Sequence, residues 1–475
     1  MRFSAFFLAG LLWVGVAQAR PTELTISLEG EAPGLWVTLV FDGDRDGRTL
    51  VRMPDRFGYA HDLWRNVTDI SVQGGRMAPF VSGDLVVDPA PSQPLTLRYR
   101  VRTQLGLAPA LGVEVGPSLA DDGAAFLGET VIAYPEGRLD GPVMVRLAPP
   151  PVGWALASDL QAGGQTTLRD ARESYLITGP GLRIVDRRLP DGSVLKVALR
   201  GRLGFTDVAV ADRAAAIVAY QRRFWNAPAS SFLITITEKA SRPGIDDWGG
   251  QGRGPDGAAL YASREVRLGK FSEILAHESA HAWFARALGG LPSGLAEPEG
   301  YWFSEGFCDY LAYRTLAEIG AMSPSDLQWM FSVRSWSEPV SQARMKSDYW
   351  REPGLFDQPY IQGFHLALIW DERLRASGKG LGLRDVLLAQ AKRAAEGGAA
   401  TADKLFPATY KALSGLDLSA DIDRYLVRGE PVVLSEPLLH ACGQIAEVET
   451  LDQAEGVKAM GDPAHCAAAA FGSGI

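Results

Sequence analysis

Two histidines stand four residues apart in the stretch ILAHESAHAWF, from 274 to 284. On a helix, His277 and His281 would project from the same face, one turn apart. Imidazoles at that separation can bind one zinc ion, and Glu278 between them can reach a water molecule on that ion. The alternative is a helix whose two histidines have ordinary packing roles. Because the chain has only 6 histidines in 475 residues, chance seldom produces this pattern, and we favour the metal.

A zinc ion held by two histidines needs a third protein ligand, and the stretch YWFSEGFCDY, from 301 to 310, offers one. Glu305 stands there among aromatic and small residues, where a buried carboxylate without a partner is costly and a metal would remove the cost. Asp309 follows on the same helical face and is expected to accept the second N–H of a ligating histidine. The alternative for Glu305 is an exposed acid at a helix start, which the helix dipole favours.

These motifs resemble those of the gluzincin metallopeptidases. HESAH followed by WFSEGF is similar to that group, and EGFCDYLAYR is most similar to the glycyl aminopeptidase family, with the alanyl and leucyl aminopeptidases as more distant relatives. The gap between His281 and Glu305 is longer than in the distant relatives, and a Gly- and Pro-rich stretch fills it. The resemblance implies a thermolysin-like catalytic domain with one zinc ion on His277, His281 and Glu305.

A second matching segment is QPYIQGFHLALIWDERLR, from 358 to 375. In the relatives a Pro-Tyr-x-Lys-Gly stretch supplies a tyrosine whose hydroxyl steadies the tetrahedral oxyanion, so the resemblance implies this role for Tyr360. A phenol is a suitable donor to a developing negative charge. Gln362 stands where the relatives have lysine, and an ordinary core tyrosine is the alternative for Tyr360.

The Gly-rich stretch GGQGRGPDG corresponds to the loop that binds substrate in these aminopeptidases. The resemblance implies substrate-binding roles for Gly250, Gln251, Gly252 and Arg253. The relatives carry a glutamate here that holds the free amine of the substrate, whereas this chain has Gln251 and Arg253, and Arg253 would oppose an amine. Asp246, Asp247 or Asp256 could take the place of the acid.

The hydrophobic pattern along the chain changes twice. From residue 22 to about 200, short apolar runs broken by Gly, Pro and Asp predict a β-sandwich-like domain, with one strand at 129–135 and a hairpin at 182–201 around a PDG turn. A helix at 207–225 and strands at 231–239 and 258–266 follow. The remainder is mostly helical, with helices expected at 271–288, 304–319, 324–335, 358–376, 382–395 and 417–427.

We therefore predict an α+β multidomain fold with an N-terminal β-sandwich-like domain, a thermolysin-like α/β catalytic domain and a C-terminal helical domain. The predicted parts are a signal peptide (1–19), a β-rich N-terminal domain (20–204), the zinc catalytic domain (205–335), a helical domain (336–435) and a C-terminal tail (436–475). We expect the alanine-rich end of the tail to be frayed.

The first nineteen residues predict export. They contain an early Arg2, an apolar run from Phe6 to Val16, and small residues before Arg20, as in a secretory signal peptide. No later stretch reaches about 18 uninterrupted apolar residues, so we expect a periplasmic or secreted protein without stable membrane insertion. A formal net charge of -9 without a basic cluster argues against nucleic-acid binding.

The three cysteines of the chain have different expected roles. Cys442 and Cys466 are expected to form a disulfide; a zinc site with His440 and His465, or free thiols, are the alternatives. For Cys308, beside the metal motif, we favour a small buried residue over a reactive thiol.

The sequence thus predicts an exported zinc metallopeptidase that acts on peptide or protein substrates, with aminopeptidase action as one form of this activity. Glu278 is the expected general base and Tyr360 the expected oxyanion donor. One alternative is a zinc hydrolase of a non-peptide substrate. Another is a binding or chaperone-like protein with a structural metal site. The sequence leaves open the cleavage preference, the choice between terminal and internal cleavage, and the oligomeric state.

Overall fold

A computed structural model provides the fold of residues 20–472. It describes this range apart from 30–33, 59, 81–82, 92, 103–117, 121–122, 161–162, 240–246, 253, 255, 285–286, 293, 323–339, 398–399 and 443–462. The predicted signal peptide, Arg253 and the predicted helix at 324–335 lie outside the described residues. No helix in the described part of the chain is long and apolar enough to cross a membrane.

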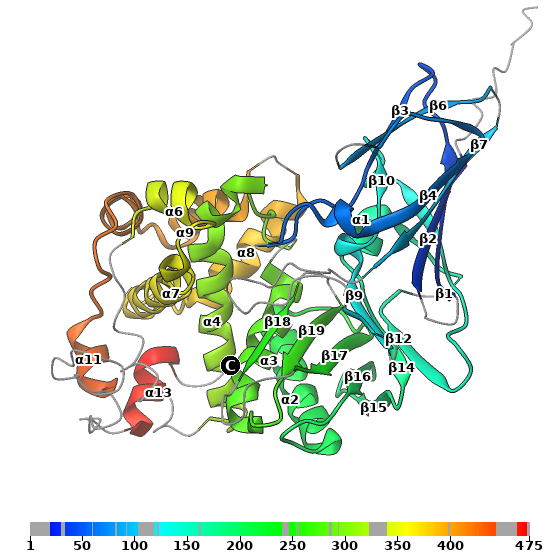
Figure 1. The fold of residues 1–475 in the computed structure, drawn as a ribbon. Coiled ribbons are helices and arrows are strands. Elements are labelled where there is room, and N and C mark those ends of the chain that lie inside the picture. The colour runs from blue at the N-terminus through cyan, green and yellow to red at the C-terminus, as the bar shows by residue number, and fades with distance from the viewer. Residues whose placement is uncertain are drawn as a thin grey trace, which may run out of the picture.

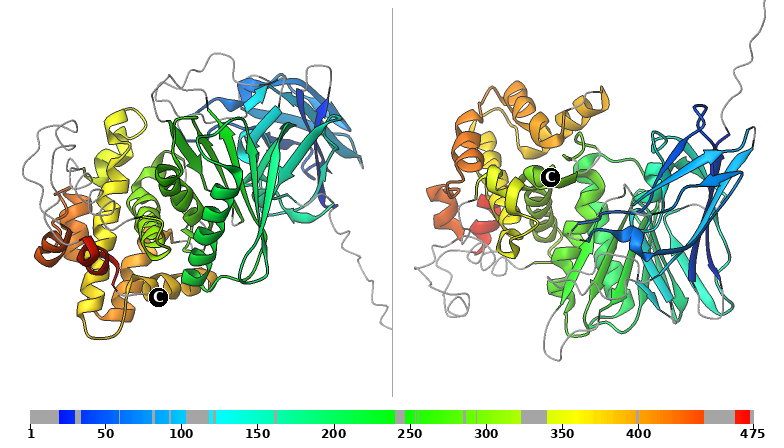
Figure 2. Two further views of the ribbon diagram at one scale, coloured as in Figure 1. Left: turned by 90° about the horizontal axis from the view of Figure 1, so that it is seen from below. Right: turned by 45° about the horizontal axis from the view of Figure 1, so that its top comes forward.

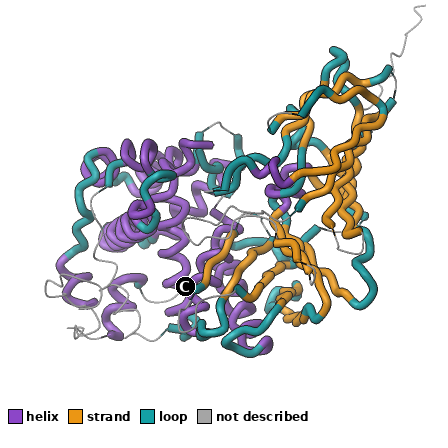
Figure 3. Tube along the Cα trace, viewed as in Figure 1, coloured by secondary structure: helices purple, strands orange, loops and turns teal. Residues whose placement is uncertain are grey.

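The N-terminal part consists of short strands in three sheets (Figures 1 and 3). A six-stranded sheet has the order β13 (Gln165–Thr167), β11 (Pro142–Leu147), β1 (Thr22–Glu29), β2 (Gly34–Asp42), β7 (Pro94–Val101), β4 (Val67–Gln73). A four-stranded sheet has the order β10 (Tyr134–Pro135), β3 (Thr49–Arg52), β6 (Asp84–Pro89), β5 (Gly75–Met77). The third has the order β12 (Trp154–Ser158), β14 (Tyr175–Pro180), β9 (Gly123–Leu127), β8 (Ser118–Ala120).

Alternation of buried and solvent-facing side chains explains why these segments form strands. In β7 every second side chain is buried, and the inward residues of the first two sheets share one core that includes Val37, Val51 and Leu97. Three short helical turns connect the strands: η1 (Leu63–Asn66), η2 (Gly128–Thr130) and α1 (Leu168–Arg172).

The strand predicted at 129–135 is wrong for most of its length. Only Tyr134–Pro135 is a strand, and η2 occupies the start of the segment. Val131 and Ala133 are buried, but their backbones pair with the side chain of Tyr99, whose hydroxyl donates to the Val131 carbonyl and accepts from the Ala133 N–H. A short buried apolar run does not by itself distinguish a strand from an irregular core segment.

A five-stranded sheet lies between the N-terminal strands and the helical part of the molecule (Figures 1 and 2). Its order is β15 (Arg183–Arg188), β16 (Val194–Arg200), β17 (Phe232–Glu238), β19 (Gly257–Ala262), β18 (Trp248–Gln251). The predicted hairpin forms β15 and β16, with Gly192 in the left-handed conformation at its turn. Because β16 pairs in parallel with β17, this sheet continues across the predicted domain boundary at 204.

Two helices pack against this sheet. Helix α2 (Asp207–Trp225) begins at Thr206, whose side chain accepts the Ala209 N–H, and it coincides with the predicted helix. Helix α3 (Leu268–Phe284) carries the two histidines. Apolar residues of both helices, such as Ile217 and Leu275, share one core with the strands. The sheet therefore provides a rigid base for α3.

The described residues that follow are mostly helical, as predicted, and several of these helices share an aromatic core that includes Trp302, Phe307, Trp370 and Phe406. The helical segments are η3 (Gly294–Gly300), α4 (Tyr301–Glu318), α6 (Gln342–Asp348), η4 (Pro353–Leu355), α7 (Gln358–Ala376), α8 (Leu383–Ala395), α9 (Ala402–Ser414), α10 (Ser419–Asp421), η5 (Ile422–Val427), α11 (Glu436–Cys442) and α13 (Pro463–Phe471). The sequence patterns did not predict α6, α9, α11 or α13.

Helices α4 and α7 approach each other through two glycines. A Cβ atom added to Gly363 would lie 1.8 Å from the Trp302 carbonyl oxygen, and one added to Gly306 would lie 2.3 Å from the Gly363 Cα. Only glycine permits so close a contact between the backbones. Gly306 follows Glu305 directly, so this contact fixes α7 beside the predicted metal ligand.

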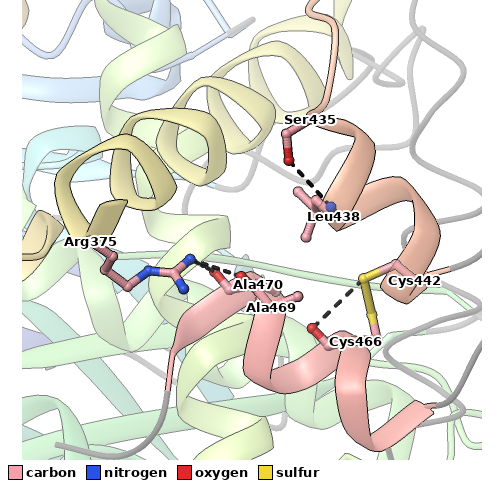
Figure 4. Close-up of a disulfide and its surroundings, with 7 residues drawn as sticks. All are labelled: Arg375, Ser435, Leu438, Cys442, Cys466, Ala469 and Ala470. Carbon is pink, nitrogen blue, oxygen red and sulfur yellow. Dashed lines mark hydrogen bonds between the residues drawn. A yellow bond between two sulfur atoms is a disulfide. The ribbon is translucent and has the colours of Figure 1, made fainter. Parts of the chain in front are cut away.

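In the C-terminal tail, a disulfide between Cys442 and Cys466 joins the described helices α11 and α13 (Figure 4). The expectation that the alanine-rich end is frayed is wrong, because Phe471 is buried and its ring packs against that of Tyr310. The Arg375 guanidinium donates to the carbonyls of Ala469 and Ala470 at the end of α13 (Figure 4). The positive charge at this helix end and the buried ring hold the segment in place.

Candidate metal centre and active site

Helix α3 places His277, Glu278 and His281 in the interior, with side chains that are almost completely buried. Each of these three residues offers a ligand atom, and the three atoms all lie within 4.8 Å of one another. The helical spacing predicted from the sequence is therefore present.

Helix α4 brings Glu305 to the two imidazoles. Nε2 of His277 lies 3.0 Å from Nε2 of His281, and Oε2 of Glu305 lies 3.3 Å and 3.2 Å from these nitrogens. Ligand atoms of a tetrahedral zinc ion, with bonds of about 2.0–2.1 Å, lie about 3.3–3.4 Å apart. The three atoms form a triangle of nearly this size, so the residues present fit a zinc ion.

The electrostatics of the site also favour a cation. Burial opposes the charged form of His277, but the Asp309 carboxylate, with a smaller contribution from Glu305, outweighs it and raises the pKa of His277 to about 10. Burial alone would raise the pKa of Glu305, yet the two imidazoles hold it well below its usual range. The site therefore stabilises positive charge between its donor atoms.

Each imidazole has a contact at its other nitrogen. Asp309 Oδ1 lies 2.8 Å from His277 Nδ1, which is the contact predicted for this aspartate. Cys308 Sγ lies 3.4 Å from His281 Nδ1, a contact that the sequence analysis missed. The position of Cys308, three residues after Glu305 on α4, was the signal that could have revealed it. The two Nε2 atoms and Oε2 of Glu305 form what we call the donor triangle. In both rings Nδ1 lies on the other side and contacts a further side chain of α4.

The carboxyl group of Glu278 is buried beside the donor triangle. Burial raises its pKa, and the imidazoles of His277 and His281 counter part of the rise. A hydrogen bond from the backbone N–H of Gly252 also lowers it. A carboxylate with a raised pKa is a stronger proton acceptor than an ordinary one.

The predicted substrate loop begins in the edge strand β18. Gly250 and Gln251 lie in β18, which pairs with β19 on one side. A Cβ atom at Gly250 would lie 2.6 Å from Glu278 Cγ, and one at Gly252 would lie 2.1 Å from the Glu278 carbonyl oxygen. These glycines therefore allow the strand to lie directly on α3. The sequence pattern indicated a substrate loop and did not indicate this packing role.

The N-terminal part of the chain also holds this strand. The hydroxyl of Tyr175, a fully buried residue at the start of β14, donates to the Gln251 carbonyl at 2.9 Å. The Tyr175 N–H in turn donates to Asp159 Oδ1 at 2.8 Å. Of the acids considered as substitutes for the missing glutamate, Asp256 accepts from Ser230 and Asp247 pairs with Lys239, whereas Asp246 lies outside the described residues.

Tyr360 lies next to the metal site, in the first turn of α7. Its ring centroid is 5.6 Å from that of His277. Burial and the nearby Glu305 carboxylate raise the pKa of the Tyr360 hydroxyl well above its usual value, so it stays protonated at neutral pH. Gln362 points elsewhere: its amide donates to the carbonyls of Val340 and Tyr425. Gln362, which stands where the relatives have lysine, therefore does not belong to the donor triangle.

Neither a protein-family model nor a curated protein sequence matches this chain. Several solved structures do. The aminopeptidase N family protein from Idiomarina loihiensis matches with a TM-score of 0.69 and 20% identity, over 88% of this chain and 77% of the other. A mutant M1 zinc metallopeptidase from Deinococcus radiodurans bound to a Tyr-Ser-Ala substrate matches with a TM-score of 0.56 and 15% identity, over 88% and 96% of the two chains.

Yeast LTA4 hydrolase in complex with bestatin is a further match, with a TM-score of 0.52 and 14% identity over 87% of this chain and 68% of the other. At these identities the likeness concerns the fold. The gluzincin resemblance of the two motifs and the three-dimensional structure thus point in the same direction: the chain has the fold of the M1 zinc metallopeptidases.

Proposed function

We propose that this protein is an exported zinc metallopeptidase that binds one zinc ion through His277, His281 and Glu305. The observation that carries the proposal is the donor triangle of two Nε2 atoms and one carboxylate oxygen, 3.0–3.3 Å apart, with the Glu278 carboxyl buried beside it. When bound, the ion supplies Lewis acidity, which lowers the pKa of water and polarises a carbonyl group.

The residues around the ion have separate roles in this proposal. Glu278 accepts a proton from the attacking water and returns it to the leaving nitrogen, because its buried carboxyl has a raised pKa. Tyr360 keeps its proton and donates a hydrogen bond to the oxyanion that develops on the substrate. Asp309 keeps the proton of His277 on Nδ1, so that Nε2 has its lone pair free.

The edge strand β18 supports peptides as the substrate class. Its outer side is not paired with any described strand, and an extended peptide can add to such an edge through backbone hydrogen bonds. One structural neighbour was solved with a Tyr-Ser-Ala substrate, which is a peptide, and another is named an aminopeptidase N family protein. We therefore infer peptide or protein substrates and include aminopeptidase action in the proposal. Export is inferred from residues 1–19 alone.

A non-peptide substrate is the second candidate, because a neighbour with the same fold is named an LTA4 hydrolase. The binding-protein alternative is less well supported, since a structural metal site does not require a buried carboxyl such as Glu278 next to the donor atoms.

The test is Glu278→Gln in zinc-loaded protein, with peptide sets that carry free or blocked N-termini and with small esters as the other substrate class. We expect zinc content to be unchanged and peptide cleavage to fall by about 10²–10⁴-fold, because the general base is lost. Glu318→Gln, an exposed acid on α4, is the matched control. Wild-type rates in the Glu278 variant would exclude this mechanism, and cleavage of free N-termini alone would identify an aminopeptidase.

A further inference from the structure

Cys308 contacts His281 at Nδ1, the ring nitrogen that is not part of the donor triangle. Its Sγ lies 3.4 Å from His281 Nδ1, and its side chain is fully buried. Nε2 of the same ring faces Glu305 Oε2 at 3.2 Å and His277 Nε2 at 3.0 Å. The sulfur is therefore next to a zinc ligand without being one of the atoms that converge on the ion.

The common uses of a thiol do not fit this position. The other two cysteines are joined to each other, so Cys308 has no disulfide partner in the chain. Because the side chain is fully buried, reagents from solvent do not reach the sulfur. Burial and the nearby carboxylates of Glu305 and Glu278 also raise the pKa of the thiol. Reactive cysteines are exposed and have a lowered pKa.

The arrangement on α4 gives the thiol a different role. Glu305, Cys308 and Asp309 stand at positions i, i+3 and i+4, which share one face of a helix. Glu305 provides a donor atom for the ion, Asp309 contacts Nδ1 of His277, and Cys308 contacts Nδ1 of His281. One helical face thus supplies a ligand and an outer contact for each imidazole.

We propose that Cys308 is a positioning residue for His281. Its sulfur accepts the Nδ1–H hydrogen bond, which keeps the proton on Nδ1 and directs the Nε2 lone pair into the donor triangle. This inference rests on the proposed zinc site and adds a residue to it. The role belongs to the neutral thiol and requires no change in its protonation.

The charge balance explains why a neutral acceptor is suitable here. The site already contains three buried or nearly buried carboxylates, Glu278, Glu305 and Asp309, around one divalent ion. A fourth carboxylate at 308 would give the buried site a further negative charge and weaken the Lewis acidity of the ion. Sulfur is a weak acceptor, so it orients the ring without this charge.

The experiment compares zinc release from the wild type with that from Cys308→Ala, Cys308→Val and Cys308→Ser. Alanine removes the acceptor without overpacking, valine removes it while filling the space, and serine keeps an acceptor. We expect the zinc dissociation rate, measured with a chromophoric chelator, to rise about tenfold in the alanine and valine variants. The serine variant should recover most of the wild-type rate. Thr315→Val, a buried change elsewhere on α4, is the control and should leave zinc release unchanged.

A readout independent of activity comes from cobalt substitution. The visible spectrum of the Co²⁺ protein should change in the alanine and valine variants and return toward the wild type in the serine variant, because it reports ligand orientation. Melting temperatures of the zinc-free proteins show whether each variant is folded. If the Cys308→Val variant does not fold, the alanine and serine variants still show whether an acceptor at this position slows zinc release.

The inference is wrong if zinc release is unchanged in the alanine variant, or if serine releases zinc as fast as alanine. These outcomes leave the proposed function intact when the wild type binds zinc and cleaves peptides. If the wild type binds zinc but cleaves no peptide, the proposed function fails while the role of Cys308 is still decided by zinc release. If the wild type takes up no zinc, both are wrong.

Discussion

The candidate active site has two halves that are built differently. In the helical half, formed by α3, α4 and α7, buried side chains meet specific partners, as His277 does with Asp309 at 2.8 Å. In the strand half, formed by β18 and Gly252, glycines bring the backbone against Glu278. Side-chain chemistry depends on residue type and spacing, whereas backbone contact depends on the absence of side chains. The two halves should therefore respond to mutation in different ways.

Apart from that of Glu278→Gln, the largest expected effect is in the helical half. Tyr360→Phe removes the proposed oxyanion donor, so we expect kcat to fall by about 10²–10³-fold with little change in KM. Zinc content should be unchanged, because Tyr360 is not among the donor atoms. Steady-state kinetics and metal analysis measure both, with Tyr425→Phe, a buried tyrosine on η5, as the control. A kcat above half of the wild-type value would show that Tyr360 only packs against His277.

The strand half is tested by Gly252→Ala. The added Cβ would lie 2.1 Å from the Glu278 carbonyl oxygen and 2.8 Å from His281 Cβ, so β18 must move away from α3. We expect kcat/KM for peptides to fall about 10- to 100-fold, since displacement of about 1 Å disturbs reacting groups strongly. Gly269→Ala is the matched control, because nothing lies within 4 Å of its added Cβ. Equal activity of the two variants would remove the distinction between the halves.

A smaller effect is expected from Tyr175→Phe, which removes the hydrogen bond from the N-terminal part to Gln251. Loss of about 1 kcal/mol in the placement of β18 corresponds to a decrease of roughly fivefold in kcat/KM. Tyr99→Phe removes an equally buried hydroxyl far along the N-terminal sheet and should lower stability without changing kcat/KM. The same kinetic change in both variants would mean that stability alone is responsible.

The remaining prediction concerns stability and its dependence on pH, and no change in activity is expected from it. Burial raises the pKa of Asp159, which accepts the Tyr175 N–H, from 3.8 to about 7. The folded protein therefore binds this proton more tightly than the unfolded chain, and the stabilisation is complete below about pH 4 and is lost as the pH rises to 7. Asp159→Asn does not titrate, so it should exceed the wild type in unfolding free energy by about 1–3 kcal/mol at pH 8.

Urea unfolding at pH 5 and pH 8 measures this difference. The advantage of the Asp159→Asn variant should be larger at pH 8 than at pH 5. An advantage of the same size at both values would show that the carboxyl group does not titrate between them.

Regular hydrophobic patterns predicted the elements of the fold better than irregular ones. The helix at 207–225 and the helix at 358–376 have the bounds of α2 and α7, because long amphipathic or apolar segments with clear ends specify a helix locally. The segment 129–135 was misassigned, because its backbone is paired with the hydroxyl of Tyr99, which lies 32 and 34 positions from the residues that it contacts. The alanine-rich helix α13 depends on Tyr310 and Arg375, which are also distant in sequence.

The sequence by itself determined the chemical groups of the site: two histidines and a glutamate at helical spacing, and an acid four residues after Glu305. Local periodicity decides which side chains share a helical face, so these groups could be recognised without a structure. Only the tertiary structure decided how the elements meet. The contact of Cys308 with His281, and the packing of Gly250 and Gly252 on α3, arise between segments that approach one another only after folding. Spacing along the chain places Cys308 on the helical face of Glu305, but only folding sets the distance from its sulfur to His281.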